Sequence, residues 1–286
     1  MSSAGAHGGG GATSKRPPPA KKSLGQHFLV DRRVLGAIVD AAEVSANDVV
    51  VEIGPGRGAL TKLLAERAGR LVAVEVDAVL AELLREKYAE HPGVSVLVED
   101  ARELDIDAVV PESSSYKVVA NLPYYAASPI VRRFLEADRK PELMVVTVQR
   151  EVAREMAAAP GKMGLLSVAV QLYGRPRIVA TVPPRAFRPA PKVTSAVVRI
   201  EVYPQPAVAF DSEREFFRVV RAGFSARRKQ IHNCLQKDLH ITPTVARDLL
   251  TGADIDPTRR AQTLSLPEWG QLYEAFRSLE AVAASS

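Results

Sequence analysis

Short apolar runs alternate with segments of helical periodicity through the first half of the chain. Five runs predict buried strands, at 49–53, 70–75, 94–98, 116–120 and 143–148. Apolar residues at helical spacing predict helices at 31–42, 60–68, 78–88 and 130–137, with Asp31 as the cap of the first. Strands that alternate with helices are typical of a parallel sheet covered on both faces. We therefore expect a doubly wound, Rossmann-like α/β domain.

The pattern changes near residues 202–210, where Pro204 and Pro206 interrupt it. Helical periodicity then continues without any strand-like run, at 213–224, 228–237, 245–250 and 266–279. Residues 1–20 are rich in Gly, Ser, Ala and Pro and carry few apolar residues, so we expect a disordered basic tail. The predicted division is a tail at 1–20, an α/β domain at 21–205 and a small all-helical domain at 206–286.

Composition narrows the class of protein. The 286 residues are 47% hydrophobic, enough for a real core, and the net charge of +5 favours a polyanionic partner without excluding an ordinary enzyme. Cys234 is the single cysteine, so neither an intramolecular disulfide nor a cysteine metal cage is possible. No run approaches the roughly 18 apolar residues of a membrane helix, and no apolar signal segment begins the chain. We expect a cytoplasmic protein without a membrane segment.

A glycine-rich turn follows the first predicted strand, with its glycines at Gly54, Gly56 and Gly58. Glycines at a strand end allow a tight turn and let a ligand lie against the backbone. Glu75 ends the second strand, where a carboxylate is expected to bind ribose hydroxyls. A nicotinamide cofactor is the alternative, but a dinucleotide fingerprint would have its third glycine at Ala59. Glu52, before the turn, favours a ligand with positive charge, such as a sulfonium methyl donor.

The ends of two further predicted strands carry groups suited to an amine. Asp100 follows the third strand and could accept a hydrogen bond from an adenine amino group, or cap a helix. The motif Asn121-Leu122-Pro123-Tyr124 follows the fourth strand. It combines a side-chain amide, a carbonyl before a proline and an aromatic face. Together these groups indicate a methyltransferase acting on adenine N6.

In order along the chain, these motifs resemble those of the ribosomal RNA adenine N6,N6-dimethyltransferases, specifically the KsgA branch that acts on small-subunit rRNA. The resemblance spans about residues 22–276 and also includes Leu24-Gly25-Gln26-His27-Phe28-Leu29, Phe187-Arg188-Pro189-Ala190-Pro191-Lys192-Val193-Thr194-Ser195 and Phe224-Ser225-Ala226-Arg227-Arg228-Lys229. It implies an S-adenosylmethionine-dependent methyltransferase domain. It also implies donor contacts from His27, Leu29, Gly54, Glu75, Asp100 and Asn121. Three positions depart from common family residues: His27 for Asn, Glu99 for Gly and Tyr125 for Asn.

The resemblance also implies the chemistry. The Asn121 side-chain oxygen and the Leu122 carbonyl accept hydrogen bonds from the target amine, and Pro123 holds Leu122 extended. Catalysis then depends on positioning and electrostatics, without a metal or a covalent enzyme intermediate. Tyr124 is expected to stack on the base, and Phe187 either supplies the opposite face or packs in the core.

Arginines recur through the predicted C-terminal helices. Arg214, Arg218, Arg221 and Arg228 would share one face if the helix continued through Gly223. Arg221, Arg227, Arg228 and Lys229 are the predicted RNA-binding residues. A charged run can instead be a solvated helix face.

The expected substrate is two adjacent adenosines in a hairpin loop near the 3′ end of 16S rRNA, within an immature small subunit, modified by a monomer. Three alternatives stay open. A resistance methyltransferase would act on large-subunit rRNA, an assembly factor would bind without catalysis, and a dehydrogenase would bind nicotinamide instead of the sulfonium donor.

Overall fold

The computed structural model describes residues 18–21 and 24–284, so the predicted tail at 1–20 lies almost wholly outside the described residues. Five parallel strands form the first part of its sheet: β2 Val49–Ile53, β3 Arg70–Glu75, β4 Val94–Val98, β5 Lys117–Asn121 and β6 Leu143–Gln149. The bounds predicted for β2, β3 and β4 are confirmed, and those of β5 and β6 differ by a residue. Continuous apolar runs made these strands recognisable, because both faces of the sheet are covered.

Two strands of this sheet were missed, and they make it mixed rather than parallel. β9 Ser195–Val202 pairs antiparallel with β6, and β7 Gly174–Val182 pairs antiparallel with β9, giving the order β4-β3-β2-β5-β6-β9-β7. β7 is an edge strand with mostly exposed side chains, and it contains Pro176. An edge position tolerates a proline and needs no apolar run, so the sequence pattern there is weak.

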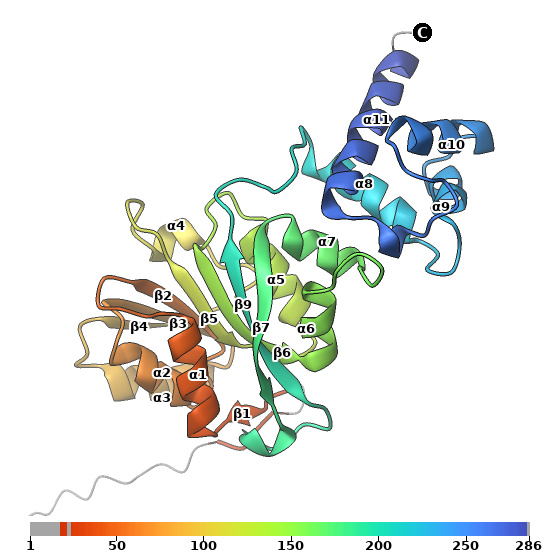
Figure 1. Cartoon of the computed structure of the whole chain (residues 1–286). Helices are drawn as coiled ribbons and strands as arrows, with labels where there is room; N and C mark the ends of the chain where they lie inside the picture. The colour runs from red at the N-terminus through yellow and green to blue at the C-terminus, as the bar shows by residue number, and fades with distance from the viewer. Residues whose placement is uncertain (1–17, 22–23, 285–286) are drawn as a thin grey trace, which may run out of the picture.

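Helices cover both faces of the sheet (Figure 1). One face packs against α1 Arg32–Ala41, α2 Ala59–Ala65 and α3 Ala78–Tyr88. The other packs against α4 Ile106–Val109, α5 Ala127–Leu135, α6 Arg150–Met156 and α7 Leu165–Gln171. Neighbouring strand residues belong to opposite layers: Val50 lies in the cluster with α1 and α2, and Val51 in the cluster with α5 and α7. The expected doubly wound α/β architecture is confirmed.

The C-terminal part of the chain forms a group of helices beyond α7 (Figure 1): α8 Glu213–Phe224, α9 Ile231–Asp238, α10 Pro243–Gly252 and α11 Leu266–Ala284. Trp269 and Phe216 are fully buried in this group. A Cβ on Gly223 would lie 2.5 Å from the Trp269 ring, so glycine permits the close approach of α8 to α11. After β9 the described residues form no further strand, and no described helix is long and apolar enough to cross a membrane.

A small second sheet joins the start of the chain to a distant loop. β1 Phe28–Leu29 pairs antiparallel with β8 Phe187–Arg188. Arg188 and Pro189 are joined by a cis peptide bond. The pairing brings His27 beside Pro189, with the His27 Nδ1 atom 2.8 Å from the Pro189 carbonyl oxygen.

Candidate active site

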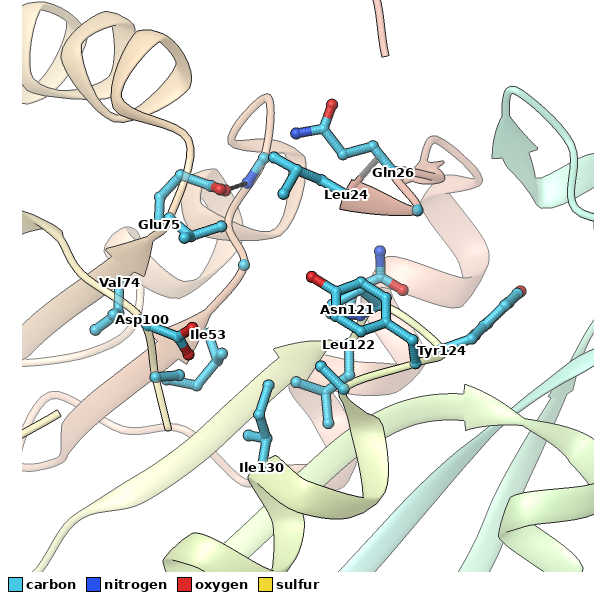
Figure 2. A pocket seen from close by; sticks show the side chains of 18 of the residues that line it. Leu24, Gln26, Ile53, Val74, Glu75, Asp100, Asn121, Leu122, Tyr124 and Ile130 are labelled. Atoms are coloured by element: carbon cyan, nitrogen blue, oxygen red, sulfur yellow. Dashed lines mark hydrogen bonds between the residues drawn. The ribbon is translucent and has the colours of Figure 1, made fainter. Parts of the chain in front are cut away.

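A cleft that is partly open to solvent lies at the carboxyl ends of the parallel strands. Its walls include Gly54 after β2, Glu75 at the end of β3, Asp100 after β4 and Asn121 at the end of β5. From β2 the chain winds outward through β3 and β4, then returns to β5 on the other side of β2. Open α/β sheets bind ligands at this reversal of strand order. Glu75 and Asp100 lie on one side of the cleft, and Asn121 and Tyr124 on the other (Figure 2).

The glycine turn forms the floor of the cleft and depends on its residue type. Gly54, Gly56 and Gly58 all have positive φ, at 68°, 57° and 76°. A Cβ on Gly56 would lie 2.9 Å from the Phe28 ring. Side chains at these positions would therefore strain the backbone, and those at Gly56 and Gly58 would also collide with the Phe28 and Leu84 side chains.

Glu75 is fixed by backbone donors. Its two carboxylate oxygens accept hydrogen bonds from the Gly56 and Asp77 amides, each at 2.9 Å, and the first is drawn in Figure 2. Burial raises the pKa of the Glu75 carboxyl, and these backbone donors oppose the rise. A carboxylate offers about four lone-pair sites, so Glu75 can still accept a hydrogen bond from a ligand hydroxyl.

The segment before β1 is held beside the same wall. The Asp77 carboxylate accepts hydrogen bonds from the Lys21 ammonium at 2.9 Å and the Gln26 amide at 3.2 Å. Leu24, Gln26 and His27 line the cleft as a result. The sequence analysis gave Gln26 no role of its own, although this residue lies in the motif Leu24-Gly25-Gln26-His27-Phe28-Leu29 and its amide binds Asp77.

Glu52 does not line the cleft, so the expectation that it faces a sulfonium is wrong. It shares the face of β2 with Val50, is 1% exposed, and interacts with Thr61 of α2. Burial raises the pKa of Glu52 to about 8. Strand alternation explains the error, because the residue just before Ile53 points to the opposite side of the sheet.

Asn121 has a defined orientation. Its side-chain nitrogen lies 3.1 Å from the His27 carbonyl oxygen, and only the NH₂ end of the amide can donate to a carbonyl. The Asn121 side-chain oxygen and the Leu122 carbonyl accept no hydrogen bond within the described part of the chain. Two acceptors are thus left available where a target amine is expected.

Tyr124 is held at both ends. Its hydroxyl lies 2.7 Å from the Ser195 hydroxyl, and its ring stacks on the His27 ring with centroids 5.7 Å apart and planes at 27°. The His27 Nδ1 atom carries the hydrogen, because its partner at Pro189 is a carbonyl. Ser195 was quoted in a motif but given no role, since a hydrogen bond to a residue 71 positions away leaves no local pattern.

Five of the six predicted donor residues line the cleft: His27, Gly54, Glu75, Asp100 and Asn121. Leu29 does not; it is 4% exposed and packs in the cluster that contains Leu35 and Ile38. Phe187 borders the cleft but is 1% exposed and belongs to the same cluster. In this arrangement most of its ring serves core packing.

The predicted face of arginines holds for three of its four members. Arg214, Arg218 and Arg221 lie on α8 at helical spacing, but α8 ends at Phe224, so Arg228 lies in the segment before α9. Arg214 pairs with Glu215, and Arg218 pairs with Glu215 and with Glu280 of α11. By contrast, the four predicted RNA-binding side chains are exposed and have no ion pair or hydrogen bond to the described residues: Arg221, Arg227, Arg228 and Lys229.

Among residues 18–21 and 24–284, no cluster of His, Cys, Asp and Glu has the arrangement of a metal site.

The family model described as ribosomal RNA adenine dimethylase matches residues 19–276. The chain belongs to this family. A protein named ribosomal RNA small subunit methyltransferase A, from Dehalococcoides mccartyi strain CBDB1, is 47% identical over 254 residues, covering 88% of this chain and 87% of that protein. A protein of the same name from Alkaliphilus oremlandii is 42% identical over 257 residues, covering 88% and 90%.

Two solved structures are similar over nearly the whole chain. The 23S rRNA methyltransferase ErmE has a TM-score of 0.69 and 28% identity, covering 87% of this chain and 99% of its own. A dimethyladenosine transferase from Plasmodium falciparum has a TM-score of 0.75 and 22% identity, covering 88% and 98%, and at this identity shows the fold alone.

Proposed function

We propose that this protein dimethylates N6 of two adjacent adenosines in a hairpin loop near the 3′ end of 16S rRNA, with S-adenosylmethionine as methyl donor. The observation that carries the proposal is the orientation of Asn121, whose free amide oxygen lies at the cleft shared by Glu75 and Asp100. The name of the 47% identical relative supports a small-subunit substrate. The protein would act as a cytoplasmic monomer on an immature subunit.

The cleft residues fit the donor. Glu75 would hold the ribose hydroxyls, since its carboxylate can accept a further hydrogen bond beside those from the backbone donors. The backbone of Gly54 and Gly56, without Cβ atoms, would lie against the donor. Asp100 would accept the donor's adenine amine. When bound, S-adenosylmethionine supplies an electrophilic methyl group on its sulfonium.

The protein's part in the reaction is to hold the nucleophile. An adenine N6 lone pair is delocalised into the ring and is a poor nucleophile. In the first methylation the Asn121 oxygen and the Leu122 carbonyl would accept both N–H groups of the amine, and in the second they would hold the one N–H that remains, so that the lone pair can turn toward the methyl group. Both acceptors are already oriented, Asn121 by His27 and Leu122 by the proline that follows it. Such preorganised electrostatics need no reorganisation during the reaction.

Tyr124 would stack on the extruded base. The hydrogen bond to Ser195 and the contact with His27 keep its ring in place, which lowers the entropy lost on binding. Stacking is worth about 1–3 kcal/mol per base, comparable with the cost of extracting one from a loop. Phe187 would provide the opposite face only if a rearrangement exposed more of its ring.

The RNA contact would come from Arg221, Arg227, Arg228 and Lys229. Cations with no acidic partner can bind phosphates without first breaking an ion pair. RNA shape and an unstacked loop adenosine would then supply specificity.

The experiment that tests the proposal incubates the full chain with S-adenosylmethionine and unmethylated small subunits, with large-subunit rRNA in parallel, and analyses the nucleosides by mass spectrometry. Dimethyladenosine only in small-subunit rRNA is the expected result. Modification of large-subunit rRNA would refute the substrate and favour the resistance group. Subunit binding without methylation would refute catalysis and favour an assembly factor.

A further inference from the structure

The Asp100 carboxylate at the cleft wall is already engaged by Arg102. The Arg102 backbone amide donates to Oδ1 at 2.9 Å. The Arg102 guanidinium donates from Nε to Oδ1 at 3.0 Å and Oδ2 at 3.1 Å, and from Nη2 to Oδ2 at 2.5 Å. This ion pair is the leading reason that the pKa of Asp100 lies below its usual value.

These contacts nearly fill the carboxylate. Two carboxylate oxygens offer about four lone-pair sites, and three N–H groups of Arg102 bind them, with the single Nε hydrogen shared between both oxygens. An additional donor therefore competes with Arg102 for the Asp100 oxygens. The backbone amide is fixed by the turn after β4, so the guanidinium is the group that can give way.

The Arg102 guanidinium is exposed enough to move away from Asp100. Its side chain is 52% exposed, compared with 27% for the Asp100 side chain, so it can move into solvent. Arg102 lines the same cleft as the exposed Tyr125. The Glu75 carboxylate differs from that of Asp100 in its partners. These are the backbone amides of Gly56 and Asp77, which stay in place when a ligand binds.

We propose that Arg102 is a latch on the donor's adenine subsite: its guanidinium closes on Asp100 in the donor-free protein and is displaced when an adenine amino group takes its place. The latch rests on the proposed function, because that function assigns the adenine amine to Asp100. Since opening separates an exposed ion pair, Arg102 competes with the donor without blocking it. The cost of opening weakens donor binding and makes it dependent on salt.

Arg102→Met tests the latch, because methionine keeps the length of the side chain but cannot donate to Asp100. Arg67→Met is the matched control, since Arg67 forms an exposed ion pair with Asp40 instead. The full chain is titrated with S-adenosylhomocysteine by calorimetry at low and high salt. We expect Arg102→Met to bind about 2- to 5-fold more tightly than wild type at low salt, the range that an exposed ion pair allows. The difference should shrink at high salt, and Arg67→Met should match wild type.

Equal or weaker binding by Arg102→Met, with normal binding by wild type, would overturn the latch alone. An equal increase in S-adenosylhomocysteine affinity in both variants would also overturn the latch, because a general charge effect would explain it. If neither wild type nor Arg102→Met bound S-adenosylhomocysteine, the donor assignment of the proposed function would fail, and the latch with it.

Discussion

Replacing Glu52 with glutamine should remove a pH-dependent loss of stability. Glu52 is 1% exposed, and its Oε2 atom is buried with no hydrogen-bond partner among the described residues. Burial raises the pKa of Glu52 from 4.5 to about 8, and the nearby Glu75 carboxyl adds to the rise, while Thr61 and Lys87 oppose it. In the folded protein Glu52 therefore keeps its proton up to about pH 8.

The direction of the pH effect on stability follows from comparing the folded and unfolded chains. Between pH 4.5 and about 8 the folded chain holds a proton on Glu52 that the unfolded chain releases, so rising pH favours unfolding. Each full pH unit in this window costs about 1.4 kcal/mol, and between about pH 5 and pH 8 the sum is about 3–4 kcal/mol, because ionisation is only partial near both ends of the window. Below this window both states are protonated and the effect vanishes. Glutamine is neutral in both states, so Glu52→Gln should lose this dependence.

Urea denaturation of wild type and Glu52→Gln at about pH 5 and pH 8 measures the effect. The free energy of unfolding of Glu52→Gln, relative to wild type, should rise by about 3–4 kcal/mol between the two conditions. Glu66→Gln is the control, because Glu66 is an exposed carboxyl near the same helices and should show no comparable change. A Glu52→Gln difference that stays constant with pH would refute a buried, protonated Glu52.

Three further changes test the site. Asn121→Ala should keep subunit binding but lose most methylation in the mass-spectrometric assay. Full methylation activity in this variant would refute the proposed mechanism. Gly56→Ala should weaken S-adenosylhomocysteine binding by about tenfold or more in calorimetry, because its φ of 57° and the Phe28 ring 2.9 Å from the new Cβ strain the turn. Arg221→Glu with Arg228→Glu should weaken subunit binding about tenfold at low salt in a filter-binding assay, with donor affinity unchanged; unaltered binding would make these residues a plain solvated surface.

The sequence predicted the central strands well because burial on both faces leaves a simple signal. Val49–Ile53 is apolar at four of five positions, and its observed bounds match the prediction. β7 has no such signal, since it lies at the sheet edge with most side chains exposed and Pro176 in its ladder. Where tertiary position rather than local pattern stabilises a strand, a period-based reading misses it.

For the candidate site, strand ends indicated which residues meet but not how their side chains pair. The hydrogen bond from Asn121 to the His27 carbonyl spans 94 positions, and it determines which atom of the amide faces the cleft. For Glu52 the location itself was predicted wrongly. Its place beside the glycine turn suggested a ligand contact, whereas strand alternation directs it to the buried side of the sheet.

The C-terminal arginines show why charge periodicity alone overstates an RNA surface. Arg218 lies on α8, yet its guanidinium is bound by Glu280 from α11, 62 positions away, as well as by Glu215. A cation so engaged must break its ion pairs to bind a phosphate, which offsets part of the gain. Arg214→Glu therefore provides the control for the double charge reversal: it is an exposed arginine on the same helix, paired with Glu215. If Arg214→Glu weakened subunit binding as much as the double variant, net charge rather than the unpaired cations would govern the interaction.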